Sequence, residues 1–224
     1  KILTKVLKKL KNKINYPVVI IGSKKIILSQ LKLLKKKLVF EIIDKNLIKN
    51  VELKNKIYLI DIEYAFKKPF DKISTKSKTY ISTCFKEAIK LMNNNFSNIL
   101  INGPISKKHF LSKKYPGVTE YVFDKSKIKI SKKPVMLLFN KKFSVSPYTT
   151  HIPVKNIYKE IYVKKIVNHV IEINKFYNTN FKFRPRIAIL GLNPHCESKT
   201  MSNEEDLSIR PAVKILKKNN IKVS

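Results

Sequence analysis

The stretch RIAILGLNPH, residues Arg186–His195, decides the fold that we expect for this chain. Its apolar run, Ile187 to Leu190, stops at Gly191, and the chain then presents an asparagine, a proline and a histidine. The pattern predicts a buried strand that enters a sharp turn and delivers the imidazole of His195 at its carboxyl end. In open α/β sheets, ligands bind in the crevice outside these strand ends. We therefore expect His195 to border a ligand site.

A second histidine, His151, has a similar position in the segment TTHIP, residues 149–153, just after a short strand-like run. Pro153 keeps the residue before it extended, and a helical pattern begins soon afterwards. Catalytic zinc-type sites commonly use three protein ligands and leave one position open, so two histidines at two strand ends would supply two of the three. A lone histidine is more often structural or simply exposed, and the residues alone leave both roles open.

Three other residues are weaker candidates for metal ligands. His109 lies in a lysine-flanked helical segment and is expected at the surface, whereas His169 falls within a helical pattern and is expected to be packed or at the surface. Cys196 directly follows His195, and adjacent residues rarely point at one ion, so we expect a small apolar role for it. No obvious third ligand follows from the residues.

Helical and strand-like patterns alternate along the chain, which is typical of βαβ units around a mainly parallel sheet. Apolar residues at helical spacing predict helices over residues 2–14, 25–34, 77–92, 157–176 and 204–218. Short apolar runs predict strands over residues 17–22, 38–43, 56–62, 98–101, 134–139, 143–145 and 186–190. With 224 residues, of which 43% are hydrophobic, the chain can form one large domain or two small ones. No repeat and no Gly/Ser linker marks a boundary between lobes.

The bulk composition also indicates where the protein works. No apolar run approaches the roughly 18 residues needed to span a bilayer, and the first residues lack the continuous apolar region of a secretory signal. The two cysteines, Cys84 and Cys196, give neither a disulfide framework nor a four-thiolate zinc site, which suits a reducing cytoplasm. The chain begins with lysine, so we expect a segment before it. No membrane partner is expected.

The formal net charge of +33 would ordinarily suggest a nucleic-acid partner. However, only three of the 48 basic residues are arginines, Arg184, Arg186 and Arg210. Arginine is preferred for bidentate contacts with phosphates and guanines, whereas lysine is a solvated point charge. The lysines are spread along the whole chain, so we interpret them as solvated faces. A lysine-rich nucleic-acid-binding protein remains the remote alternative.

Two glycine turns precede helical segments and carry polar candidates. NGPISK, residues 102–107, follows a predicted strand and opens a helix, so its turn is a natural anion site to which Lys107 could add a charge. YPGVTE, residues 115–120, presents the hydroxyl of Thr119 and the carboxylate of Glu120 after a Pro-Gly bend. The alternative for Thr119 is a capping role at the next helix. Neither of the glycine-rich phosphate loops, GxGxxG or GxxxxGK[ST], is present.

Taken in order, NGPISK, YPGVTEYV, TTHIPV and RIAILGLNPH followed by Glu204-Glu205-Asp206 resemble the 4-hydroxythreonine-4-phosphate dehydrogenases of pyridoxal phosphate biosynthesis. The resemblance covers essentially the whole chain and is strongest from Ile99 onward. It implies a three-layer α/β/α fold with a mainly parallel sheet, of the isocitrate/isopropylmalate dehydrogenase-like type, in two lobes with a cleft between them. One such motif would be weak, whereas four in the same order and spacing identify the family.

The resemblance also implies a reaction and its cofactors. The family oxidises 4-phosphooxy-L-threonine with NAD or NADP and releases CO2, giving 3-amino-2-oxopropyl phosphate for vitamin B6. Three histidines hold a divalent metal (Zn, Mg or Co), and two of them match His151 and His195. Thr119 matches a substrate contact, and the enzyme is expected to be a cytoplasmic homodimer with a shared active site.

The chain departs from the family pattern at several points. The family's usual Gly-His-Thr-Glu reads Gly117-Val118-Thr119-Glu120 here, so Val118 stands where a substrate-binding histidine is expected and only Thr119 carries over. The third metal histidine, the phosphate-binding residues and most nicotinamide contacts are expected beyond Ser224. We therefore expect a partial domain over residues 1–224, incomplete at both ends, that does not turn over substrate by itself. Because of Val118, a dehydrogenase of threonate or erythronate 4-phosphate is the alternative activity.

Overall fold

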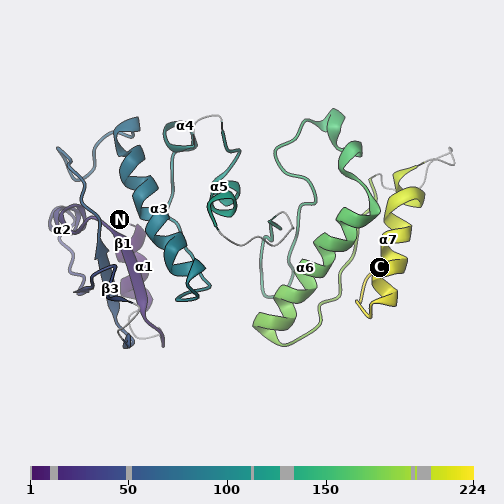
Figure 1. Ribbon diagram of the computed structural model, residues 1–224, viewed down its shortest axis with the longest axis horizontal. Coiled ribbons are helices and arrows are strands. Elements are labelled where there is room, and N and C mark those ends of the chain that lie inside the picture. Colours follow the sequence, from purple (N-terminus) through teal and green to yellow (C-terminus); the bar gives the residue numbers. More distant parts are fainter. Residues whose placement is uncertain are drawn as a thin grey trace. The chain divides into compact units, whose positions relative to one another are not determined.

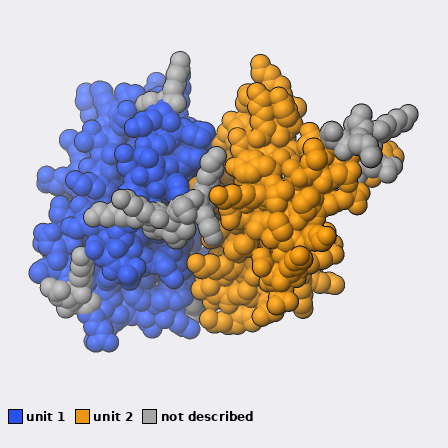
Figure 2. Space-filling model, turned by 45° about the vertical axis from the view of Figure 1, so that its right-hand side comes forward, with its two compact units in different colours: residues 1–130 blue, residues 131–224 orange. Residues whose placement is uncertain are grey.

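A computed structural model describes residues 2–10, 15–48, 52–111, 114–126, 134–192, 195 and 203–224. The chain divides into two compact units, residues 1–130 and 131–224 (Figure 2). Each unit has hydrophobic clusters of its own. Two such units agree with the expectation of a two-lobed protein.

The first unit contains a three-stranded parallel sheet with strand order β1-β3-β2 (Figure 1). β1 (Val18–Gly22) and β3 (Ile57–Asp61) are paired in parallel along their whole length. β2 (Glu41–Ile42) is much shorter than the predicted strand over 38–43 and pairs with β3 on its other side. The strands predicted over 17–22, 38–43 and 56–62 therefore exist, and the parallel direction is confirmed.

Side chains alternate between the two faces of this sheet, and helices cover both faces. Leu59 of β3 and Ile20 of β1 pack against Leu7 of α1 (Ile2–Leu10), and α2 (Lys24–Leu33) lies against the same cluster. The next residue of β3, Ile60, faces the opposite way and packs against Leu91 of α3 (Lys78–Asn93). Figure 1 shows α2 and α3 on opposite sides of the strands. The expected three-layer α/β/α arrangement is therefore present in the first unit.

The remaining segments of the first unit form a second hydrophobic cluster on the other side of α3. A short 3-10 helix, Thr75–Ser77, leads into α3, and α4 (Lys107–Phe110) and α5 (Val118–Lys125) follow it. The rings of Phe85 and Phe110 stack at 5.6 Å between centroids, and Tyr121 of α5 meets both edge-on. These rings pack with Ile89 and Leu111, so the segment that carries the NGPISK and YPGVTE motifs is anchored on α3.

The second unit is built on the packing of α6 (Val163–Phe181) against α7 (Arg210–Lys218). Val170 of α6 and Leu216 of α7 lie in one cluster with Ile221 and Val223 of the chain's last residues. Two 3-10 turns, Val154–Asn156 and Tyr158–Glu160, precede α6, and a π-helical segment, Glu205–Ile209, leads into α7. The predicted helix over 157–176 therefore begins later and ends later than expected.

Four predicted strands are not strands in the structure. Residues 98–101 form no ladder and residues 186–190 form only a short contact with the chain's last residues, while Ile101 and Leu190 are 88% and 83% exposed. Residues 186–190 form one parallel bridge, Ile187 to Val223, and residues 134–139 and 143–145 form one antiparallel bridge, Leu138 to Val145. A strand requires a neighbouring chain that accepts and donates hydrogen bonds along its length. Residues 186–190 are hydrogen-bonded only to the short segment 222–224, and the described part of the chain gives residues 98–101 no ladder partner.

The central position of Leu59 makes it a direct test of this core. Its side chain is fully buried between α1 and the sheet. We expect Leu59→Ala to lower the free energy of unfolding by about 2–5 kcal/mol, because it removes buried methyl groups and leaves a cavity. Chemical denaturation followed by circular dichroism measures the change.

The matched control is Val39→Ala, because Val39 is 82% exposed and should lose less than about 0.5 kcal/mol. Equal losses in the two variants would contradict the assigned core.

Candidate functional site

His151 is exposed and has a left-handed backbone conformation with φ of 57°. Positive φ is uncommon outside glycine, although histidine, asparagine and aspartate are found there more often than other residues. Such conformations cost of order 1–3 kcal/mol and cluster at active sites and ligand clamps. Lys35, Asn95, Lys182 and Asn220 share this conformation just after the ends of helices, whereas His151 has it in a loop.

The segment before His151 runs along α6 in the opposite direction and contacts it at successive points. Phe139 stacks on Phe181 with centroids 5.1 Å apart, and the Tyr177 hydroxyl donates to Ser144 Oγ at 2.8 Å. Further along, the Tyr148 hydroxyl donates to the Glu160 carbonyl at 2.9 Å. These contacts fix the approach of the chain to His151.

Between these points, Ser146 connects the segment to His169 of α6. Its hydroxyl donates to the Met136 carbonyl at 2.6 Å and lies 2.7 Å from Nε2 of His169. Because the Ser146 hydroxyl proton is already donated to the Met136 carbonyl, the Nε2–H of the His169 imidazole donates to Ser146 Oγ. Burial lowers the pKa of His169, and the nearby Lys165 ammonium lowers it further. His169 is thus a neutral structural donor, in agreement with the expectation of a packed residue.

The Lys165 ammonium is itself held in this network. It lies over the Tyr148 ring, 4.7 Å from the centroid, and its Nζ is 2.6 Å from the Glu160 carboxylate. Burial raises the pKa of the Tyr148 hydroxyl to about 12. Tyr148, whose ring centroid lies 5.6 Å from that of His169, is therefore a neutral phenol, and burial together with the Lys165 ammonium favours the uncharged imidazole.

The second predicted histidine, His195, is exposed, and the turn before it is joined to the start of the π-helical segment. The Leu192 N–H donates to Oε1 of Glu205 at 3.0 Å, and the Glu205 side chain is only 4% exposed. Asn193, Pro194 and Cys196 lie outside the described residues. The role expected for Cys196 therefore stays a prediction.

The two histidine-bearing segments pack on one hydrophobic cluster. Its buried residues are Ile161, Ile166 and Ala212, and both Tyr148 and Ile189 pack against them. Tyr148 shortly precedes His151, and Ile189 shortly precedes His195. The imidazoles therefore emerge from segments that share a core, and imidazole suits divalent zinc, copper, iron and nickel. Within the described ranges, no group of three or more His, Cys, Asp and Glu side chains could hold a metal ion.

Lys107, in the first unit, is the exposed first residue of α4, a helix of one turn. The preceding Ser106 places its hydroxyl 2.8 Å from Nδ1 of His109. His109 is half-buried rather than fully exposed, since it turns back to this serine.

Val118 and Thr119 begin α5, whose N-cap is Gly117 and not Thr119. The alternative role of Thr119 as the helix cap is therefore wrong, and its side chain is exposed. Val118 packs against the cluster formed by Phe85, Phe110 and their neighbours. Val118 thus has a hydrophobic contact where the family pattern has an imidazole.

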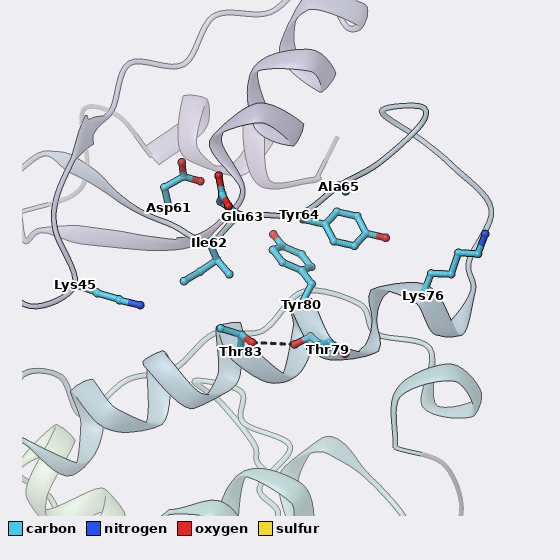
Figure 3. A pocket seen from close by; sticks show the side chains of 10 residues that line it. All are labelled: Lys45, Asp61, Ile62, Glu63, Tyr64, Ala65, Lys76, Thr79, Tyr80 and Thr83. Carbon is cyan, nitrogen blue, oxygen red and sulfur yellow. Dashed lines mark hydrogen bonds between the residues drawn. The ribbon is translucent and has the colours of Figure 1, made fainter.

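A pocket of about 490 Å³ lies at the carboxyl end of β3, and sequence reasoning did not identify it (Figure 3). Figure 3 shows Asp61, Tyr64 and Tyr80 around it, with Lys76 to one side. The Lys24 N–H donates to Oδ1 of Asp61 at 2.8 Å, and the Ser23 N–H donates to the Tyr80 hydroxyl at 2.8 Å. These groups satisfy the first backbone donors of α2, so the polar atoms here have a structural use.

The Tyr80 ring also packs tightly in this pocket. It stacks on Tyr64 with centroids 4.7 Å apart, and a Cβ added at Gly22 would lie 3.1 Å from its hydroxyl. Burial raises the pKa of Tyr80 and also that of the neighbouring Cys84 thiol. Cys84 is therefore a protonated thiol at neutral pH, not an activated nucleophile.

Comparison with known proteins connects this arrangement to one family. Residues 13–224 match the family described as pyridoxal phosphate biosynthetic protein PdxA. Proteins named 4-hydroxythreonine-4-phosphate dehydrogenase from Sulfurihydrogenibium sp. (strain YO3AOP1) and Aquifex aeolicus (strain VF5) are each 34% identical, over 100% and 99% of this chain and 68% of their own length.

Solved structures under the same enzyme name have the same fold. The Klebsiella pneumoniae structure superposes with a TM-score of 0.73 at 23% identity, covering 94% of this chain and 65% of its own. The Burkholderia phymatum structure gives 0.78 at 21%, covering 100% of this chain and 68% of its own. The chain thus spans about two thirds of these proteins, and the expected fold class is confirmed.

His169 gives a pH test of the network beside His151. In the unfolded chain its imidazole takes a proton near the ordinary pKa of 6.5, whereas in the folded protein it does so only at lower pH. The folded state then binds fewer protons, so this contribution to stability is present above pH 6.5 and is lost as the pH falls below it. We expect the free energy of unfolding to decrease from pH 7.5 to pH 5, and His169→Gln to reduce that decrease.

Denaturation curves at the two pH values measure the effect, with His109→Gln as the control for loss of an imidazole in the other unit. The same pH dependence in the parent protein and in His169→Gln would contradict this account.

Proposed function

The chain belongs to the family of the pyridoxal phosphate biosynthetic protein PdxA, and we propose that it provides two metal ligands of a 4-hydroxythreonine-4-phosphate dehydrogenase. The reaction is the oxidation of 4-phosphooxy-L-threonine by NAD or NADP, with loss of CO2, to 3-amino-2-oxopropyl phosphate. This places the protein in vitamin B6 biosynthesis. We further propose a cytoplasmic homodimer with a shared active site, on the strength of the family resemblance.

The proposed ligands are His151 and His195. The observation that carries this proposal is that the segments leading to both histidines pack on the same cluster around Ile166 and Ala212. Both imidazoles are exposed, and the backbone of His151 has the left-handed conformation that recurs at ligand sites. The third histidine of the family pattern has no counterpart in this chain, so the third ligand is proposed to come from elsewhere in the protein.

The chemistry follows from what these side chains can do. When bound, a divalent ion (Zn, Mg or Co) supplies Lewis-acid stabilisation of the alkoxide and enolate charges that the reaction develops. The imidazoles of His151 and His195 would hold that ion, and a bound NAD or NADP would supply the hydride acceptor. Thr119 offers an exposed hydroxyl to the substrate, and Lys107 offers an exposed cation to an anionic group.

Val118 favours one alternative substrate class. Its side chain packs into the cluster around Phe110 and so presents no polar group at the position of the family's substrate-binding histidine. Without the imidazole donor of the family's histidine, the site discriminates less strongly between one phosphorylated four-carbon acid and another. The alternative activity is therefore oxidation of threonate or erythronate 4-phosphate.

The metal proposal is tested by removing each imidazole. We expect His151→Ala and His195→Ala each to weaken Zn²⁺ or Co²⁺ binding and to lower kcat/KM at least about 100-fold, because loss of a ligand should cost no less than loss of its supporting partner. Calorimetry and a nicotinamide absorbance assay on the full-length protein measure the two effects.

His109→Ala, which removes an imidazole of the first unit, is the matched control for metal affinity. Unchanged metal affinity in both His151→Ala and His195→Ala would show that these residues are not ligands.

The substrate proposal is tested by kinetics on both classes. We expect kcat/KM for 4-phosphooxy-L-threonine to exceed that for threonate and erythronate 4-phosphate at least about tenfold, equivalent to 1.4 kcal/mol of transition-state stabilisation. A preference for either sugar acid would replace the assigned substrate with the alternative.

A further inference from the structure

The side chains of Leu190 and Leu192, shortly before His195, are exposed. Leu190 is 83% exposed and Leu192 is 49% exposed, so the side chains on both sides of Gly191 lie largely in solvent. The last apolar residue before Leu190 that packs on the clusters of α6 and α7 is Ile189, which is half-buried.

Glu205 binds the backbone three residues before His195. Its side chain is 4% exposed, and its Oε1 accepts the Leu192 N–H at 3.0 Å. A hydrogen bond to a carboxylate is stronger than one between neutral groups. A carboxylate is also costly to bury, so its presence here needs the partner that it finds in the turn.

The element that carries Glu205 is itself fixed firmly. Glu205 begins the π-helical segment, and π-helical turns are found frequently at functional sites. The Asp206 N–H donates to Oδ1 of Asn203 at 2.8 Å, and the buried Ser208 hydroxyl donates to the Ile161 carbonyl at 3.0 Å. Ile161 belongs to the cluster on which the segments before His151 and His195 also pack.

We propose that Glu205 is a positioning residue for the metal site: by accepting the Leu192 N–H it holds the turn that carries His195 in the orientation required of a ligand. This inference rests on the proposed metal-binding role of His195. Glu205 is not proposed to contact the metal or the substrate. It acts through the side-chain oxygen that accepts the Leu192 hydrogen bond.

Three variants distinguish the effect of the Glu205 acceptor oxygen from the effect of its negative charge and from a general loss of stability in this segment. Glu205→Ala removes the acceptor, Glu205→Gln keeps an oxygen acceptor without the charge, and Glu204→Ala changes the preceding, half-buried glutamate as a matched control. The first readout is hydrogen exchange of the Leu192 amide, measured by NMR without metal. The second is the Kd for Zn²⁺ alone, measured by calorimetry.

We expect Glu205→Ala to speed exchange of the Leu192 amide at least tenfold and to raise the Kd for Zn²⁺ about 10–100-fold, the usual cost of losing a ligand's supporting partner. Glu205→Gln and Glu204→Ala should stay within about threefold of the parent protein in both readouts. Unchanged exchange or unchanged Zn²⁺ affinity in Glu205→Ala would overturn the proposal, as would a loss in Glu205→Gln equal to that in Glu205→Ala.

Failure of the proposed function would look different. If the parent protein bound no Zn²⁺ through His151 and His195, the metal role would be contradicted, whereas the exchange of the Leu192 amide would still show whether Glu205 holds the turn.

Discussion

Burial of one face of α6 is the interaction on which the second unit depends. Its buried residues, Ile166, Val170, Ile173 and Tyr177, recur at helical spacing along the element. α7 and the chain's last residues pack against Val170, while the segment that leads to His151 is fixed by hydrogen bonds and ring contacts to the polar edge of α6. A single helix thus supports both segments that end in a candidate ligand.

Strand formation shows how far the sequence could predict this fold. The β-branched runs at 17–22 and 56–62 became β1 and β3 because each had the other as a neighbour and helices to cover both faces. The runs at 98–101 and 186–190 have the same apolar character, yet they form no strand among the described residues. An apolar pattern indicates that a segment is suited to burial. A strand also requires a hydrogen-bonding partner along its length, which a local window of sequence does not reveal.

The same distinction applies to the site. Motif order correctly indicated the family, and the predicted strand ends before His151 and His195 directed attention to the second unit, although neither strand forms in the described part of the chain. The supporting polar groups were less visible, because hydrophobic periodicity does not show which polar side chains become buried. His169 was expected to be packed or at the surface, but its bond to Ser146 joins residues 23 positions apart. Glu205 stands in a run of three acidic residues, and only the structure shows that it is buried against a turn.

The proposed function requires that His151 and His195 bind one metal ion. Diffraction from crystals of the full-length protein soaked in Zn²⁺, recorded at the zinc absorption edge, locates that ion. We predict one anomalous peak within about 2.0–2.1 Å of an imidazole nitrogen of each histidine. A peak bound to only one of them, or zinc bound only elsewhere on the protein, would contradict the claim.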